Sequence, residues 1–132
     1  MIGYFGDIVF ETSDKRILTF SDFQRNIASR WAKHNRLGKK PATEFLGPDL
    51  DTVSFVVNLS GGFGIKPKQE MDKWLIYARS GKAETLVIGT GALGVDKWTV
   101  QSVSQMWDVV WNNGKVYSGK VEVTLEEYVE VL

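Results

Sequence analysis

Residues 52–59 read TVSFVVNL and alternate apolar and polar side chains with a period of two. Val53, Phe55, Val57 and Leu59 fall on one side, whereas Ser54 and Asn58 fall on the other. Such alternation is typical of a strand that buries one face and leaves the other in contact with water. We therefore predict a half-buried strand here, ended by the glycines that follow it.

One helix is predicted over about residues 67–80. Pro67 suits the first helical turn, where its missing N–H needs no partner, and Gly81 suits the C-terminal cap. Glu70 and Asp72 lie in the early turns, where the helix dipole favours negative charge. The apolar stripe of this helix consists of Met71, Trp74, Leu75 and Ala78. We expect this stripe to pack on a sheet.

The rest of the chain contains further strand patterns and no alternation of strands with helices. We expect strands at 7–12, 23–31, 84–89, 97–103 and 120–129, with a tight turn at Asn113-Gly114. This order predicts an α+β fold: a mainly antiparallel β-sandwich or rolled sheet with one packed helix. With 132 residues, we expect a single domain over 1–132.

Composition excludes several classes of function. The chain has no cysteine and a single histidine, His34, so we expect neither a disulfide nor a metal site. Sixteen basic and sixteen acidic residues give no net charge, which argues against a nucleic-acid binder. No run approaches the ~18 apolar residues of a membrane span, and the N-terminus lacks a secretory signal pattern. We expect no insertion into a membrane. We expect the protein to assemble in the cytoplasm.

Residues 89–94, GTGALG, match the glycine spacing of a dinucleotide-binding loop. That loop works only at the start of a helix, and the following residues VDKWTVQSV favour a strand. We therefore predict a hairpin turn and no cofactor, although a small-ligand site remains an alternative.

The sequence offers no defined catalytic set. Glu44, Asp49, Asp51 and Asp72 could supply a pair of carboxylates for acid/base chemistry, yet their spacing singles out no pair. His34 lies in AKHNRLGKK, which we expect to be an exposed loop, and it lacks an evident orienting partner. We predict no catalytic residues; a carboxylate-dependent cell-wall hydrolase is the enzymatic alternative.

Charge is segregated along the chain. Residues 23–43 contain six basic side chains and no acid: Arg25, Arg30, Lys33, Arg36, Lys39 and Lys40. Residues 121–132 contain four acids and no base: Glu122, Glu126, Glu127 and Glu130. Two interpretations remain open: two solvated surfaces, or a basic stretch that faces the acidic strand of a neighbouring subunit.

An ordered set of segments resembles a known family. RWAKHNRLGKKPATEFLGPDLDTVSFVVNLSGG is followed by the helix before Gly81, ETLVIGTGALG, WTVQSVS, the Asn-Gly turn and VEVTLEEY. This order resembles the tail protein U (GpU) family of contractile-tailed bacteriophages and phage-tail-like bacteriocins. The resemblance spans nearly the whole chain.

The resemblance implies a virion structural protein with no enzymatic activity and a fold similar to that of tail-tube proteins. It implies a ring, expected to hold six copies, where the tail tube meets the baseplate hub. The implied partners are the tail tube or its initiator, a LysM-bearing hub protein and baseplate proteins. The alternative is a tail terminator or completion protein at the other end of the tube.

Overall fold

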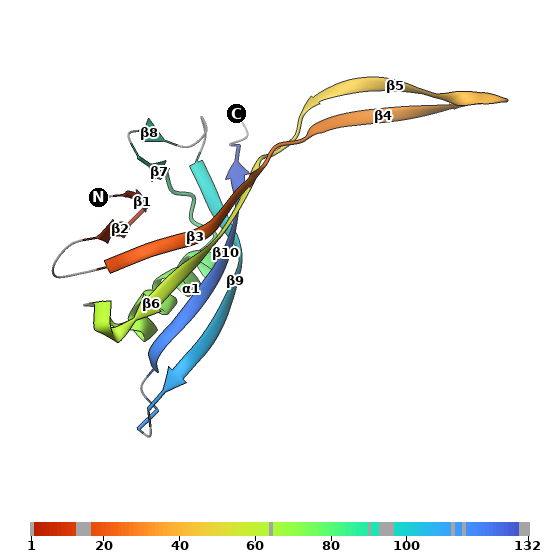
Figure 1. Cartoon of the computed structure of the whole chain (residues 1–132). Helices are drawn as coiled ribbons and strands as arrows, with labels where there is room; N and C mark the ends of the chain where they lie inside the picture. Colours follow the sequence, from red (N-terminus) through yellow and green to blue (C-terminus); the bar gives the residue numbers. More distant parts are fainter. Residues whose placement is uncertain are drawn as a thin grey trace.

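The structure is a computed structural model that describes residues 2–12, 17–63, 65–89, 91–92, 97–111, 113–114 and 116–129 (Figure 1). One α-helix, α1 (Pro67–Ser80), and one 3-10 turn, η1 (Gly61–Phe63), are present in this part of the chain. The strands are β1 (Gly3–Phe5), β2 (Ile8–Thr12), β3 (Ile17–Asn26), β4 (Ser29–Arg36), β5 (Lys39–Pro48), β6 (Thr52–Ser60), β7 (Leu86–Ile88), β8 (Gly91–Ala92), β9 (Lys97–Val110) and β10 (Val116–Tyr128).

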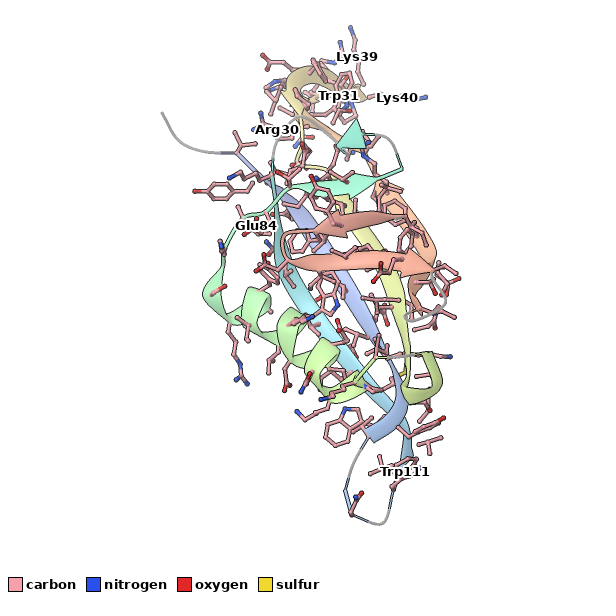
Figure 2. The ribbon with its side chains drawn as sticks, turned by 90° about the vertical axis from the view of Figure 1, so that its left-hand side faces the viewer. Arg30, Trp31, Lys39, Lys40, Glu84 and Trp111 are labelled. Atoms are coloured by element: carbon pink, nitrogen blue, oxygen red, sulfur yellow. The ribbon has the colours of Figure 1, made fainter. Side chains whose placement is uncertain are left out.

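The strands form one large sheet and one separate pair. The large sheet has the order β8-β7-β1-β2-β3-β6-β10-β9, and β4 pairs with β5. The described strand pairs are antiparallel. In Figure 2, β1 and β2 cross in front of β6 and β10, and α1 lies beside them. The sheet therefore rolls over on itself, and the predicted α+β fold with one packed helix is confirmed.

The core forms where the rolled sheet closes on α1. The Trp74 ring on α1 stacks on Phe5 of β1 and on Phe10 of β2, with ring centroids 5.6 Å and 6.1 Å apart. It also meets the edge of Phe55 on β6 at 5.7 Å. Trp74 is fully buried, so a single indole joins the helix to three strands.

The predicted bounds and caps of the helix are confirmed. Pro67 occupies the first helical turn, and Gly81 adopts a left-handed conformation with φ 67° while its N–H donates to the Tyr77 carbonyl at 3.2 Å. The buried stripe differs in part from the expected one. Tyr77 is buried with Met71 and Trp74, whereas Leu75 and Ala78 are only half-buried.

Residues 23–48 depart most from the prediction. The strand expected over 23–31 is wrong as one element, because β3 ends at Asn26 and β4 begins at Ser29. The segment around His34, expected to be a loop, belongs to β4, and β5 was not predicted at all. Neither β4 nor β5 has a fully buried face, so their sequences lack the one-sided apolar alternation by which β6 was found.

Replacing Trp74 with alanine should lower the free energy of unfolding by about 3–5 kcal/mol, because the substitution leaves a cavity among three phenylalanine rings. Ile76→Ala is the matched control, since Ile76 lies on the same helix and is 64% exposed. That control should change stability by less than about 0.5 kcal/mol. Urea denaturation followed by fluorescence measures both, and equal losses would contradict this account of the core.

Candidate interaction surface

A two-stranded ribbon projects from the rolled sheet (Figure 1). We call this ribbon, residues 29–48, the arm; it consists of β4, β5 and the turn at Leu37-Gly38. The arm continues the β3–β6 pair beyond the large sheet, because β3 leads into β4 and β5 leads into β6. All arm residues are described, and none of them belongs to the buried core.

The two faces of the arm differ in chemistry. Trp31 and Phe45 are cross-strand partners whose rings meet edge to face at 5.2 Å, and they remain 54% and 57% exposed. On the opposite face, His34 Nε2 lies 3.0 Å from Glu44 Oε2. An isolated two-stranded hairpin is marginally stable in water at best. Exposed aromatic rings on such a ribbon are typical of a contact surface.

A buried carboxylate fixes the base of the arm. The Arg25 guanidinium donates to Asp51 Oδ2 at 2.6 Å and 3.2 Å, and only 12% of the Asp51 side chain is exposed. The Asp51 N–H donates to Glu127 Oε1 at 2.7 Å, while the Glu127 N–H donates to the Asp51 carbonyl at 3.0 Å. These bonds tie the end of β3 and the start of β6 to β10, so the arm leaves the sheet from a fixed point.

The predicted charged residues fall in different places. Arg25 is at the arm base, whereas the five other cations, Arg30, Lys33, Arg36, Lys39 and Lys40, lie on the arm itself, as Figure 2 shows for three of them. Glu122 and Glu126 lie on the outward face of β10, and Glu127 bonds with Asp51. Glu130 lies outside the described residues. The structure thus brings together Arg25 and Glu127, through Asp51, within one molecule.

The outward face of the long strands is also uncovered. Val53, Phe55, Val57 and Leu59 of β6 are buried on the inward face, as predicted. Small polar side chains dominate the opposite face of β3, β6, β10 and β9: Thr19, Ser21, Ser54, Asn58, Ser102, Ser104 and Thr124. At the free edge of this sheet, the end of β9 and the residue after it expose apolar side chains on both faces: Met106, Trp107, Val109, Val110 and Trp111. The sequence pattern pointed to neither surface, because strand order decides which strand becomes the edge.

The sequence matches the model of the Phage P2 GpU family over residues 6–130. The chain belongs to the Phage P2 GpU family. This family comprises structural or terminator-type proteins of phage tails, so the chain is a component of a virion tail. The matched residues include the arm, its base and β9. The search among curated proteins gives no match.

The described residues of the glycine-rich segment in this GpU-family chain, Gly89, Gly91 and Ala92, belong to a β7–β8 hairpin, as predicted, whereas Gly94 lies outside the described residues. Val87 pairs with Ala92 and Ile88 with Gly91, and Gly89 turns the chain with φ 72°. The next described element is β9 rather than a helix, so the helix N-terminus that a dinucleotide loop needs is not formed by the described residues.

The four candidate carboxylates bind separate partners. Asp51 bonds with Arg25, Glu44 with His34, and Asp72 Oδ1 with Lys68 Nζ at 3.0 Å. Asp49 Oδ1 accepts the Leu50 N–H at 2.8 Å. In the described ranges, no group of three His, Asp or Glu side chains could hold a metal ion. No helix in the described part of the chain is long and apolar enough to cross a membrane.

One opening of about 360 Å³ lies between α1 and the turn after β1. Among the described residues that line it, Asp7 is the single carboxylate, and Lys73 and Lys82 are the cations. A hydrogen bond from Lys82 Nζ to the Glu84 carboxylate, 3.0 Å long, raises the pKa of the Lys82 ammonium. Hydrolysis of a glycosidic bond generally uses two carboxylates. The residues that line this opening do not provide that pair.

Replacing Asp51 with alanine should lower the free energy of unfolding by about 1–3 kcal/mol, because it removes a charged hydrogen-bond acceptor that is largely buried. Amide exchange should quicken most around residues 25–28 and 49–52, where the arm joins the sheet. Asp108→Asn on the exposed part of β9 serves as the control and should change neither quantity. Unchanged exchange in Asp51→Ala would show that this carboxylate does not hold the arm base.

Proposed function

We propose that this GpU-family chain builds a ring of six copies where the tail tube meets the baseplate hub. Its partners there would be the tube or its initiator, the LysM-bearing hub protein and baseplate proteins. Assembly would take place in the host cytoplasm. The assembled particle would be a phage or a phage-tail-like bacteriocin. The single observation that carries the proposal is the arm, a ribbon with no core residue and two uncovered faces.

Charge favours another copy of the chain as the partner of the arm. The arm carries five Lys or Arg and one Glu, a formal charge of +4, and the whole chain has no net charge. The remainder of each copy therefore carries −4. We call the chain outside the arm the body. A ring needs two unlike patches that meet head to tail, and an arm that docks on the body of a neighbouring copy meets this requirement.

The acidic partners of the arm are Glu122 and Glu126 of the neighbouring copy, in this proposal. Glu122 is exposed and Glu126 is half-exposed on the uncovered face of β10. Glu127 serves the arm base within its own molecule, so it contributes less to a contact between copies. Glu130 belongs to the same acidic group in the sequence.

Replacing residues 29–48 by Asn-Gly should abolish incorporation into tail particles while leaving the body folded. The Asp49 N–H already donates to the Ala28 carbonyl at 3.0 Å, so a two-residue turn can close the hairpin there. Thermal unfolding checks the fold, and immunoblotting of purified particles checks incorporation. Normal incorporation of the armless chain would refute the proposed role of the arm. Imaging of particles with the full-length chain locates the ring, and a position at the far end of the tube would favour the terminator alternative.

Charge reversal tests the contact itself. Lys39→Glu with Lys40→Glu should reduce incorporation, and the loss should grow at low salt, where charge repulsion is screened least. Adding Glu122→Lys and Glu126→Lys should restore assembly. Lys66→Glu with Arg79→Glu, at the two exposed ends of the α1 region, is the control and should assemble normally. If incorporation changes neither with the charge reversal nor with the salt concentration, this charge pairing is excluded.

A further inference from the structure

β9 offers an unprotected sheet edge. It is the last strand in the order of the large sheet, and the described structure pairs its other side only at Trp98, with Glu84. Between irregular positions near Gln101 and Asp108, residues 102–107 keep a regular register with β10. These six residues, SVSQMW, contain no charge and no proline. Proteins generally blunt exposed edges with charges, prolines or bulges, so such a stretch is a template for another strand.

The opposite edge of the same four long strands is blunted. β3 pairs with β2 only through Ile17 and Leu18, which leaves its remaining outer edge free. A register shift interrupts this edge between Ser21 and Gln24, and Asp22 has a positive φ of 55°. The bulge and the charged Asp22 disfavour pairing with another strand. β3 is therefore a poor partner for the β9 edge of a neighbouring copy.

The arm has free strand edges that can supply the partner strand missing at the edge of β9. Its two strands pair only with each other, so each has an unpaired outer edge. Trp31 to His34 pair in regular register with Ala42 to Phe45. β4 has eight residues and spans about 27 Å, whereas the six-residue stretch of β9 spans about 20 Å. A third strand would also convert a marginal hairpin into a small sheet.

We propose that the arm of one copy pairs, as a β-ribbon, with the free edge of β9 in a second copy. This inference rests on the proposed function and names the surface that receives the arm. Pairing there places the arm beside Met106, which is exposed on the same outward face of β9 as Ser104 and can contact the Trp31–Phe45 pair. It also places the arm cations about 10 Å from the β10 backbone, two strand spacings away.

That spacing suits the charge pairing. Ser102 and Ser104 lie on the outward face of β9, and Ser104 is directly opposite Glu122. Because these serines are small, a long Lys or Arg side chain on the arm can pass over them to reach the Glu122 carboxylate. Strand pairing and charge pairing therefore describe one contact.

The absence of cysteine allows a direct test with single-cysteine chains. Two differently tagged variants, Thr43→Cys on the arm and Ser104→Cys on β9, are expressed together with the other tail genes, and purified particles are treated with a short bis-maleimide. Both positions are exposed in the isolated chain. We expect a cross-linked dimer that carries both tags, which can form only between copies.

The controls separate the possible pairings. Ser54→Cys, on the central strand β6, should give little cross-linking to Thr43→Cys. A product only from Ser104→Cys with itself, or from Ser104→Cys with Ser21→Cys on β3, would overturn the arm pairing in favour of β9–β9 or β9–β3 contacts. Particles that contain the variants without the Thr43–Ser104 product would also overturn it and leave the proposed function standing. Particles that lack the full-length unmodified chain would instead contradict the proposed function.

Discussion

The burial of Trp74 determines which surfaces of the molecule are used by the core and which remain exposed. Its ring contacts Phe5, Phe10 and Phe55, so one side chain fixes α1 against three strands. β1 and β2 roll over β6 and cover one face of the long strands. The large buried side chains of the core lie on this covered face. The opposite face, the outer backbone edge of β9 and the arm have no part in this core. They are therefore free to serve contacts between molecules.

The arm is kept separate from the core but not loosely attached to it. Asp51 accepts two hydrogen bonds from Arg25 and bonds through its backbone with Glu127 on β10. A carboxylate this buried is costly without such partners, so the bonds hold β3, β6 and β10 at the point where the arm departs. The direction of the arm is thus a property of the folded body, although the arm itself contributes nothing to the core.

The sequence predicts those elements that bury one face. The sequence predicts β6 and α1 because their apolar residues repeat with periods of two and about 3.6. The sequence does not predict the arm, since Trp31 and Phe45 lie among polar residues on a ribbon without a buried face. The cations of the arm were identified as a group, yet the role of Arg25 depends on Asp51, 26 positions away. The open edge of β9 is set by the order of strands in space, which local periodicity does not encode.

In the proposed assembly, the geometry of the arm base would determine whether the copies close into a ring. Each copy offers one arm and one β9 edge, so every docked copy leaves another unlike pair of surfaces free, and growth continues until the last edge meets the first arm. A head-to-tail contact of this kind closes only if each step turns by the right angle; otherwise it gives an open filament. The bonds of Asp51 with Arg25 and Glu127 hold the strands from which the arm leaves, and in this proposal they would constrain that angle. In this proposal, the partly exposed Arg25–Asp51 ion pair would therefore help to set the number of copies in the ring.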